Sequence, residues 1–260
     1  MSFTDVSGAR IYWKLEGRDD APALVLLNSI GTDMDLWDPL LPQLREQFRL
    51  LRIDTRGHGA SDAHDTGDYS LEMLANDVLA VADEAGLHGF SIAGVSLGAM
   101  IGMELALLQP ERVEKLALVC TSVTMDPAAW QARIDTVLGQ GMSSIAELAM
   151  GRFLSPEMRE DDPALYDTVL RQLVAMDPHG YAGCCAAIRD MDLAGRIGGI
   201  ASPVLVVTGT RDASTPYEGH GAFLVDTIPG AVHVSVDGAH LATFEAPEAL
   251  AQALISFVKS

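Results

Sequence analysis

The sequence predicts an α/β fold in which a mostly parallel sheet carries helices on both faces and a helical cap interrupts the core. Three observations lead to this prediction. Apolar runs alternate with amphipathic helical stretches over residues 1–121, the alternation returns over 200–260, and only helical patterns lie between them. We therefore expect a core made of 1–121 and 200–260 and a cap of 122–199. A chain of 260 residues suits one domain with a substantial core.

The first part of the chain contains three expected strands. Residues 11–15 alternate loosely between apolar and polar side chains, which is typical of an antiparallel strand. Residues 23–27 and 50–54 are nearly continuous apolar runs, as in strands covered on both faces. One helix is expected over 37–48, between these two strands. A second is expected over 71–85, where apolar residues recur at helical spacing.

The most informative stretch is a Gly-x-Ser-x-Gly turn between an apolar strand that begins at Phe90 and a helix predicted over 97–108. Gly94 and Gly98 allow a sharp turn because they lack the Cβ atoms that would collide with the neighbouring strand and helix. Ser96 then stands at the apex in a strained conformation, with its hydroxyl clear of the sheet. The free N–H groups at the start of the helix point to the same place, where an oxyanion would form.

The remaining elements follow the same alternation. Another buried strand is predicted over 115–120, directly before the cap. The cap contains four segments with a helical pattern: 128–138, 144–153, 163–176 and 181–191. After the cap we expect strands over 203–209 and 231–236 and a closing helix over 246–258.

Two residues that follow the late strands are the expected partners of Ser96. In open α/β sheets, ligands bind at the carboxyl ends of the strands. Asp212 comes shortly after the first late strand, and His240 comes shortly after the second. A serine nucleophile needs a base, and the base needs an orienting carboxylate. We therefore predict a catalytic triad of Ser96, Asp212 and His240, in the chain order that this architecture uses.

Other acidic residues and histidines compete for these roles. Asp237 and Asp226 are alternatives for the carboxylate. His58 lies in a Gly-rich loop and is predicted to be structural, and His233 lies inside a strand. Four histidines occur in polar stretches and are predicted to lie at the surface: His64, His88, His179 and His220.

Two backbone N–H groups are expected to form an oxyanion hole. Leu97 directly follows the nucleophile, and Ile30 lies in the loop after the strand over 23–27. No spacing of His, Cys, Asp and Glu predicts a metal site, and no motif predicts a cofactor. We therefore expect catalysis with neither.

Composition argues against several classes of partner. Asp and Glu number 36 against 17 Lys and Arg, for a net charge of −19, so nucleic acid and anionic membranes are not expected partners. No apolar run is long enough to span a membrane, and the amino-terminal residues lack a signal-peptide pattern. The three cysteines fit a reduced protein, so a cytoplasmic location is expected. The oligomeric state stays open.

Several segments resemble the α/β-hydrolase fold and, more closely, the bacterial 3-oxoadipate enol-lactonases. They are 27–33 with Trp37-Asp38, 52–61, 94–98, 130–134 and 181–193. The resemblance implies a mostly parallel eight-stranded sheet with the cap inserted after the sixth strand. It also implies Ser96, Asp212 and His240 as the triad, and cofactor-free hydrolysis of a small carboxylated enol-lactone to 3-oxoadipate in the β-ketoadipate pathway of aromatic catabolism.

The substrate carboxylate needs a local cation in a chain of this charge. Arg133 is the expected residue, because it lies with Trp130 on one face of a cap helix, and Arg189 is the alternative. The cap has Arg152 and Phe153 where the family usually has a tryptophan. A carboxylesterase, a perhydrolase or another lactonase with the same triad is the second hypothesis. A ligand receptor of this fold, without turnover, is the third.

Overall fold

An eight-stranded sheet forms the centre of the computed structural model, which describes residues 2–63 and 67–260. Its spatial order is β1-β2-β4-β3-β5-β6-β7-β8. The strands are β1 Ser2–Val6, β2 Ala9–Gly17, β3 Ala23–Leu27, β4 Arg49–Ile53, β5 Phe90–Val95, β6 Val113–Val119, β7 Val204–Gly209 and β8 Val232–Val236. Strands β3 to β8 are parallel, whereas β1 pairs with β2, and β2 with β4, in antiparallel fashion. The predicted mostly parallel, eight-stranded sheet is thus confirmed.

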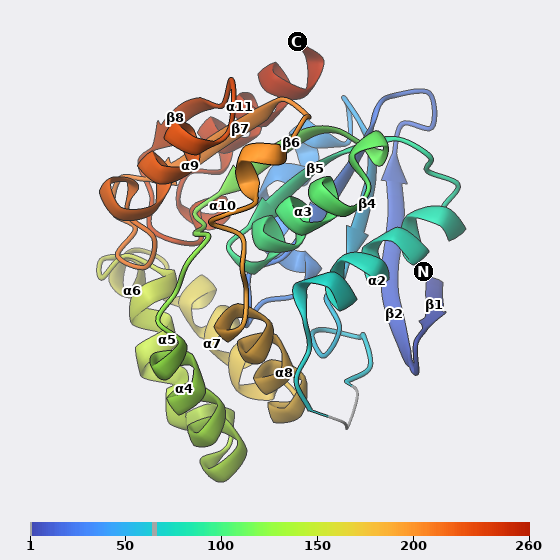
Figure 1. The fold of residues 1–260 in the computed structure, drawn as a ribbon. Coiled ribbons are helices and arrows are strands. Elements are labelled where there is room, and N and C mark those ends of the chain that lie inside the picture. The colour runs from blue at the N-terminus through green and yellow to red at the C-terminus, as the bar shows by residue number, and fades with distance from the viewer. Residues whose placement is uncertain (1, 64–66) are drawn as a thin grey trace.

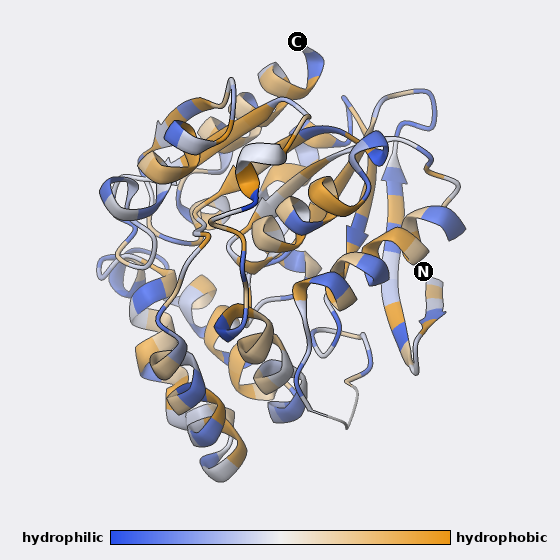
Figure 2. Cartoon of the chain, in the orientation of Figure 1, coloured by the Kyte–Doolittle hydropathy of each residue, from blue (hydrophilic) through white to orange (hydrophobic). Residues whose placement is uncertain are grey.

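Helices cover both faces of the sheet (Figure 1). On one face, α2 (Leu71–Glu84) and α3 (Leu97–Leu108) pack against each other, and α3 lies on β3, β5 and β6. On the other face, α11 (Pro247–Lys259) packs on β8 and on α1 (Leu41–Leu44). Helix α3 is almost wholly buried, and most of it is hydrophobic (Figure 2). The nucleophile candidate Ser96 therefore precedes a helix that is held firmly in the core.

Between β6 and β7 the chain forms helices and no strand, and every residue of this segment is described. The helices are α4 Pro127–Gln140, α5 Ala146–Phe153, α6 Met158–Asp161, α7 Pro163–Ala175 and α8 Pro178–Arg189. Asp126, Asp162 and Asp177 each precede a proline at the first helical position, and each accepts a backbone N–H as an N-cap. Figure 1 shows these helices grouped at one end of the sheet. We call residues 122–199 the cap, with boundaries that remain predictions.

The first part of the chain differs from the sequence prediction in two regions. The helix expected over 37–48 is a 3-10 helix, η1 (Met34–Leu40), followed by the single turn of α1. Pro39 and Pro42 lie within this stretch and lack the backbone N–H groups that a continuous α-helix needs. Strand β1 lies at the edge of the sheet, and only its central residue is buried. It therefore has no apolar run, and the sequence pattern did not predict it.

Two further observations concern expectations from composition. All three cysteines are free and buried. None of the helices among the described residues is long and apolar enough to cross a membrane. The cytoplasmic location stays a prediction.

Candidate active site

The backbone at Ser96 has the strained conformation that the turn between β5 and α3 requires. Ser96 has φ 54° and ψ −114°, a positive φ that non-glycine residues rarely adopt. A Cβ on Gly94 would come under 3.0 Å from the backbone of Gly98 and Ala99, and one on Gly98 would come equally close to the backbone of Leu27. Only glycine fits at these two positions, so the spacing of the motif follows from packing.

Hydrogen bonds to neighbouring strands hold this turn in place. The Ser96 N–H donates to the carbonyl of Val119, at the end of β6, over 2.9 Å. The Thr121 hydroxyl donates to the carbonyl of Ser96, also over 2.9 Å. Both main-chain polar groups of Ser96 are therefore fixed by the last residue of β6 and by Thr121 just after it.

Asp212 and His240 are in direct contact. The Nδ1 atom of His240 lies 3.0 Å from Oδ2 and 3.1 Å from Oδ1 of Asp212, and both side chains are buried. The Thr215 hydroxyl donates to Asp212 Oδ2 over 2.7 Å, and the Ser214 N–H donates to Oδ1 over 2.8 Å. The carboxylate is thus fixed by its own loop and accepts from the histidine ring.

The charge of Asp212 fixes the tautomer of His240. Burial by itself raises the pKa of the Asp212 carboxyl, but the facing His240 and the hydrogen bonds from Thr215 lower this pKa to about 2. An ionised carboxylate can only accept, so Nδ1 of the ring carries the proton and Nε2 keeps its lone pair. The alternatives Asp237 and Asp226 are exposed, and Asp237 pairs with Arg211 instead.

Ser96 and His240 line the same cavity, which has a volume of about 30 Å³. Ile30 and Met100 add to its core side, and the cap contributes Trp130, Arg133, Arg152, Phe153 and Ile188. Asp212 lies behind His240, buried and away from the cavity wall. The structure therefore brings the three predicted triad residues to one place, from the ends of β5, β7 and β8.

The loop that carries Ile30 is a tight turn with little freedom. The Thr32 N–H donates to the carbonyl of Ser29 over 3.2 Å, and Gly31 between them has φ 83°. The Gly31 N–H donates to Nε2 of His58 over 3.0 Å. Ile30 itself lines the cavity, and its role as an oxyanion-hole donor stays a prediction. Leu97, the second predicted donor, is the first residue of α3, where an N–H has no partner within the helix.

His58 holds this turn as a neutral side chain. It is buried, and burial lowers its pKa to about 4. Since Nε2 accepts from Gly31, Nδ1 carries the proton, and it donates to the carbonyl of Arg56 over 3.2 Å. His58 therefore connects the turn at Ile30 to the Gly-rich loop after β4.

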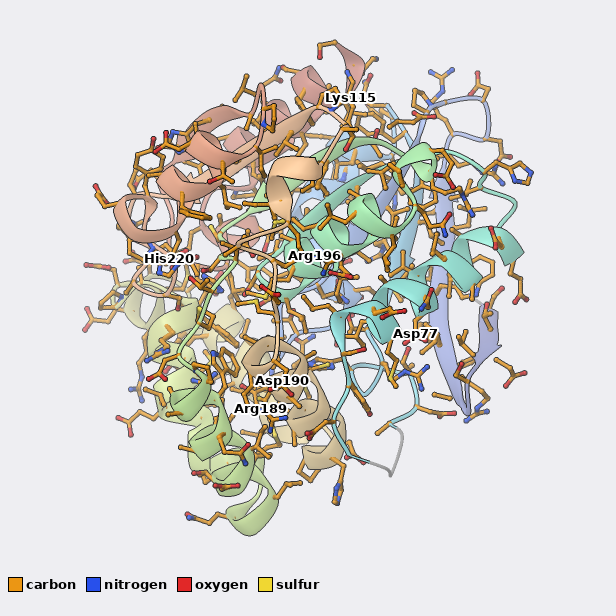
Figure 3. All side chains as sticks on the ribbon, in the orientation of Figure 1. Asp77, Lys115, Arg189, Asp190, Arg196 and His220 are labelled. Carbon is orange, nitrogen blue, oxygen red and sulfur yellow. The ribbon has the colours of Figure 1, made fainter. Side chains whose placement is uncertain are left out.

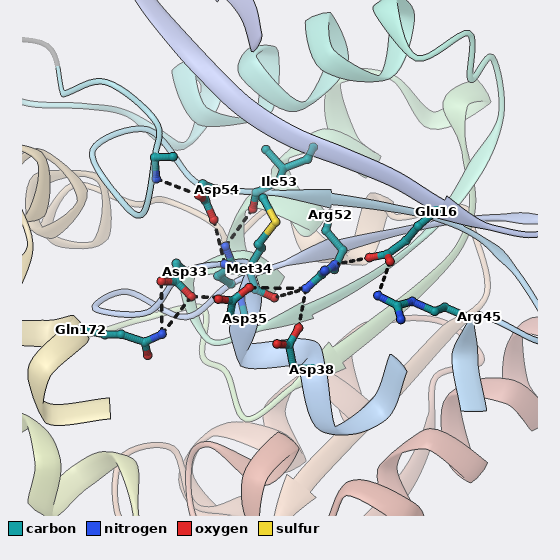
Figure 4. A network of polar contacts seen from close by, with 12 residues as sticks. Glu16, Asp33, Met34, Asp35, Asp38, Arg45, Arg52, Ile53, Asp54 and Gln172 are labelled. Carbon is teal, nitrogen blue, oxygen red and sulfur yellow. Dashed lines mark hydrogen bonds and ion pairs between the residues drawn. The ribbon is translucent and has the colours of Figure 1, made fainter. Parts of the chain in front are cut away.

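A network of acidic side chains lies around the start of η1, in the segment that follows the turn at Ile30 (Figure 4). Asp54 accepts the backbone N–H groups of Met34 and Ala60, each over 2.8 Å, and burial raises its pKa to about 6. Asp33 accepts from the side chain of Gln172 of α7, so the network reaches the cap. Arg52 pairs with the acidic residues at the far end of the network. These contacts hold the segment that follows β3 in place.

The predicted substrate arginine, Arg133, is placed at the cavity, whereas its alternative is not. The guanidinium of Arg133 stacks 4.8 Å from the ring centroid of Trp130 and donates to the Tyr181 hydroxyl over 3.3 Å. Arg189 lies beside Asp190 (Figure 3) and pairs with Asp190 and Asp68. It does not line the cavity. Two carboxylates already neutralise Arg189, which favours Arg133.

Sequence reasoning missed two residues near the site. Arg152 lines the cavity. In the sequence it showed only as a difference from the tryptophan usual in the family, and no role was predicted for it. The predicted surface position of His220 is wrong: the side chain is half-buried, with Nδ1 2.7 Å from the Ser122 hydroxyl (Figure 3). His220 lies in a single π-helical turn, Tyr217–Gly221, whose polar, Gly-rich sequence gave no signal of burial.

The other histidines are distributed as follows. His88 and His179 are exposed, as predicted, and His64 lies outside the described residues. His233, within β8, stacks on Tyr217 at 4.2 Å between ring centroids. Among the residues that the structure describes, no group of three or more His, Cys, Asp and Glu could hold a metal ion.

Comparisons with known proteins agree with this geometry. The model of the α/β-hydrolase fold family matches residues 22–247. The 3-oxoadipate enol-lactonase 2 of Acinetobacter baylyi is 32% identical, over 94% of this chain and 91% of its own. The crystal structure of the enol-lactonase from Burkholderia xenovorans LB400 superposes with a TM-score of 0.96 at 32% identity, and both chains are covered completely.

A crystal structure of a hydrolase from Pseudomonas aeruginosa PA01 also superposes with a TM-score of 0.96. It is 38% identical and covers 100% of this chain and 98% of its own. These similarities extend over the core and the cap together. The chain belongs to the α/β-hydrolase family and is a hydrolase of its esterase and lactonase type.

Proposed function

We propose that this protein hydrolyses a small carboxylated enol-lactone, 3-oxoadipate enol-lactone, to 3-oxoadipate in the β-ketoadipate pathway. The observation that carries the proposal is the cavity that Ser96, His240 and Arg133 share. A serine hydroxyl, an imidazole and a guanidinium line one small space, which suits a nucleophile, a base and a cation for the substrate carboxylate. Two relatives named 3-oxoadipate enol-lactonase support the choice of substrate.

The reaction begins with attack by Ser96 on the lactone carbonyl. His240 removes the hydroxyl proton through Nε2, and Asp212 stabilises the resulting imidazolium through Nδ1. The N–H groups of Ile30 and Leu97 donate to the oxyanion that forms on the carbonyl oxygen. Collapse of this intermediate breaks the ring C–O bond. The enolate that leaves is weakly basic, and its α-carbon takes the proton that His240 holds. This step forms a ketone, still joined to the acyl-enzyme, and returns His240 to its neutral form.

Hydrolysis of the acyl-enzyme completes the cycle. His240 takes a proton from water, the hydroxide adds to the ester carbonyl, and Ser96 leaves with a proton returned by the ring. Arg133 holds the carboxylate of the acid arm throughout. Its positive charge offsets the repulsion of an anion by a chain of net charge −19. No cofactor takes part in any of these steps.

Steady-state hydrolysis of the enol-lactone and of a neutral aryl acetate tests the proposal, with wild-type protein and Ser96→Ala. Wild-type protein is expected to turn over the enol-lactone many times, with a higher kcat/KM than for the aryl acetate. Ser96→Ala is expected to lower both rates on the order of 10⁵-fold, because it removes the nucleophile. Ser256→Ala, at an exposed position of α11, is the matched control and should retain both rates.

The outcomes separate the competing functions. Efficient hydrolysis of the aryl acetate without hydrolysis of the enol-lactone would identify a general esterase and reject the proposed substrate. Binding of the lactone with no multiple turnover would identify a receptor. Retention of activity by Ser96→Ala would reject Ser96 as the nucleophile.

A further inference from the structure

A second cavity in the cap adjoins the one that holds Ser96. It has a volume of about 230 Å³, against about 30 Å³ for the inner cavity, and lies between α4 and the segment of η3 (Met142–Ile145) and α5. Three residues line both cavities: Trp130, Arg133 and Arg152. The inner space is too small for a whole carboxylated acyl chain, so part of any such substrate has to pass these three side chains.

Both arginines at this junction lack a carboxylate partner among the described residues. The chain has about twice as many acidic as basic residues, and most of its arginines form ion pairs with carboxylates, Arg189 of the cap among them. Arg133 and Arg152 form none with any carboxylate that the structure describes. Two unneutralised cations therefore border the same passage, next to the predicted nucleophile.

The main chain around Arg152 is tied to both loops that carry the triad. The carbonyl of Arg152 accepts from the Ser214 hydroxyl over 3.4 Å, two residues after Asp212. The carbonyl of Phe153 accepts from the Leu241 N–H over 2.9 Å, one residue after His240. The backbone of Arg152 is thus fixed relative to the triad residues, while its side chain is exposed at the cavity.

We propose that Arg152 is a second specificity-determining residue, which with Arg133 clamps the carboxylate of the substrate's acid arm at the junction of the two cavities. The reacting ester then lies in the inner cavity, and the arm extends toward the cap. A guanidinium binds a carboxylate through two parallel hydrogen bonds, and an anion between two cations also removes their mutual repulsion. The proposal rests on hydrolysis at Ser96, but not on the identity of the lactone.

A matched pair of esters tests the clamp. The anionic ester is 4-nitrophenyl hydrogen glutarate, and its neutral counterpart is methyl 4-nitrophenyl glutarate, with the same acyl chain. For Arg152→Gln we expect the ratio of kcat/KM for the anionic ester over the neutral one to fall about tenfold, mainly through KM, since one charged hydrogen-bonding partner is lost. Arg152→Lys should recover part of the ratio, because it restores the positive charge but not the two parallel N–H donors of a guanidinium.

Two further variants sharpen the test. Arg171→Gln removes an exposed arginine of α7 that donates to the Thr168 hydroxyl and lies outside both cavities, and it should leave the ratio unchanged. If both arginines hold one carboxylate, their effects on the ratio should not add. Introducing Arg152→Gln into Arg133→Gln protein should then lower the ratio by a smaller factor than it does in wild-type protein. An equal loss on both esters in Arg152→Gln would overturn the proposal, as would no loss at all.

A binding measurement separates the clamp from the proposed function. Calorimetric titration of glutarate into Ser96→Ala protein needs no turnover. Weaker binding after Arg152→Gln in that background supports the clamp even if the enol-lactone is not a substrate. Unchanged glutarate affinity would overturn the clamp even if the enol-lactone is hydrolysed.

Discussion

At the residue scale, the position of Ser96 depends on the absence of side chains beside it. A Cβ at Gly98 would meet backbone atoms of Leu27 in β3, which cannot rotate away as a side chain would. The same holds for Gly94 against the start of α3. The strained φ of Ser96 is kept only because strand and helix approach this closely. Packing of the core therefore determines where the nucleophile lies.

Gly98→Ala tests this dependence. We expect a loss of about 3 kcal/mol or more in the free energy of unfolding and a large loss of activity, because α3 has to move away from β3. Gly139→Ala, in α4, is the control: its new Cβ meets nothing within 4 Å, and better helix propensity should stabilise the protein by up to about 1 kcal/mol. Urea unfolding measures both. A Gly98→Ala protein as stable and active as wild type would contradict the packing argument.

The sequence predicted some site residues and not others, for physical reasons. Ser96, Asp212 and His240 follow strands of a parallel sheet, and such strands end at one edge, so their meeting was predictable. The roles of these residues stay predictions. Arg152 lines the cavity from a cap helix, and His220 is half-buried against Ser122 from an irregular turn. Their direction depends on how those elements pack on the core, which no periodicity encodes.

At the element scale, Glu245 joins the cap to the segment that carries His240. Its carboxylate accepts the N–H of Ser155, after α5, over 2.6 Å and the N–H of Ala239 over 3.1 Å. It also pairs with Arg211 over 3.2 Å, and its side chain is only 1% exposed. One buried carboxylate thus holds the end of α5 against the loop of the base.

Glu245→Gln keeps the size of this side chain but removes its charge and one acceptor. We expect a loss of about 2 kcal/mol in stability and a lower kcat on anionic and neutral esters alike, because the His240 loop loses its support. The control is Glu248→Gln, an exposed residue at the start of α11. Full stability and kcat in Glu245→Gln would show that the cap is held by other contacts.

The elements themselves were predictable where local chemistry agrees with packing. Three cap helices begin with an aspartate cap and a proline. The starts predicted at 128 and 163 lie within one residue of those of α4 and α7, whereas the start predicted at 181 is three residues late for α8. The buried strands β3 to β7 are apolar runs. Four of them, β3, β4, β6 and β7, lie within two residues of their predicted bounds, and β5 begins at the predicted residue, Phe90. Strand β1 and the π-helical turn at 217–221 were missed, because one lacks an apolar run and the other has no regular period.

At the scale of the whole molecule, two buried side chains near the turn at Ile30, His58 and Asp54, change the free energy of unfolding with pH in opposite directions. The pKa of His58, lowered by burial to about 4, lies below the ordinary 6.5 of histidine. The unfolded chain therefore takes up a proton first as pH falls, and stability is lost between about pH 6.5 and 4. The pKa of Asp54, raised by burial to about 6 from 3.8, has the opposite effect. The folded state takes up that proton first, so stability from Asp54 is present at low pH and is lost as pH rises toward 6.

His58→Gln should make the protein more resistant to acid than wild type. Glutamine can still accept the Gly31 N–H, but it does not titrate, so the variant avoids the loss that His58 causes between pH 7.0 and 4.5. Urea unfolding at the two pH values should give a difference from wild type on the order of 2 kcal/mol. Asp54→Asn should shift the same comparison in the opposite direction, because it removes the proton uptake that stabilises the folded state in acid. A pH dependence equal to that of wild type in both variants would contradict this account. His58 and Asp54 would then have the same pKa in the folded and unfolded chains, as expected of side chains that are open to solvent.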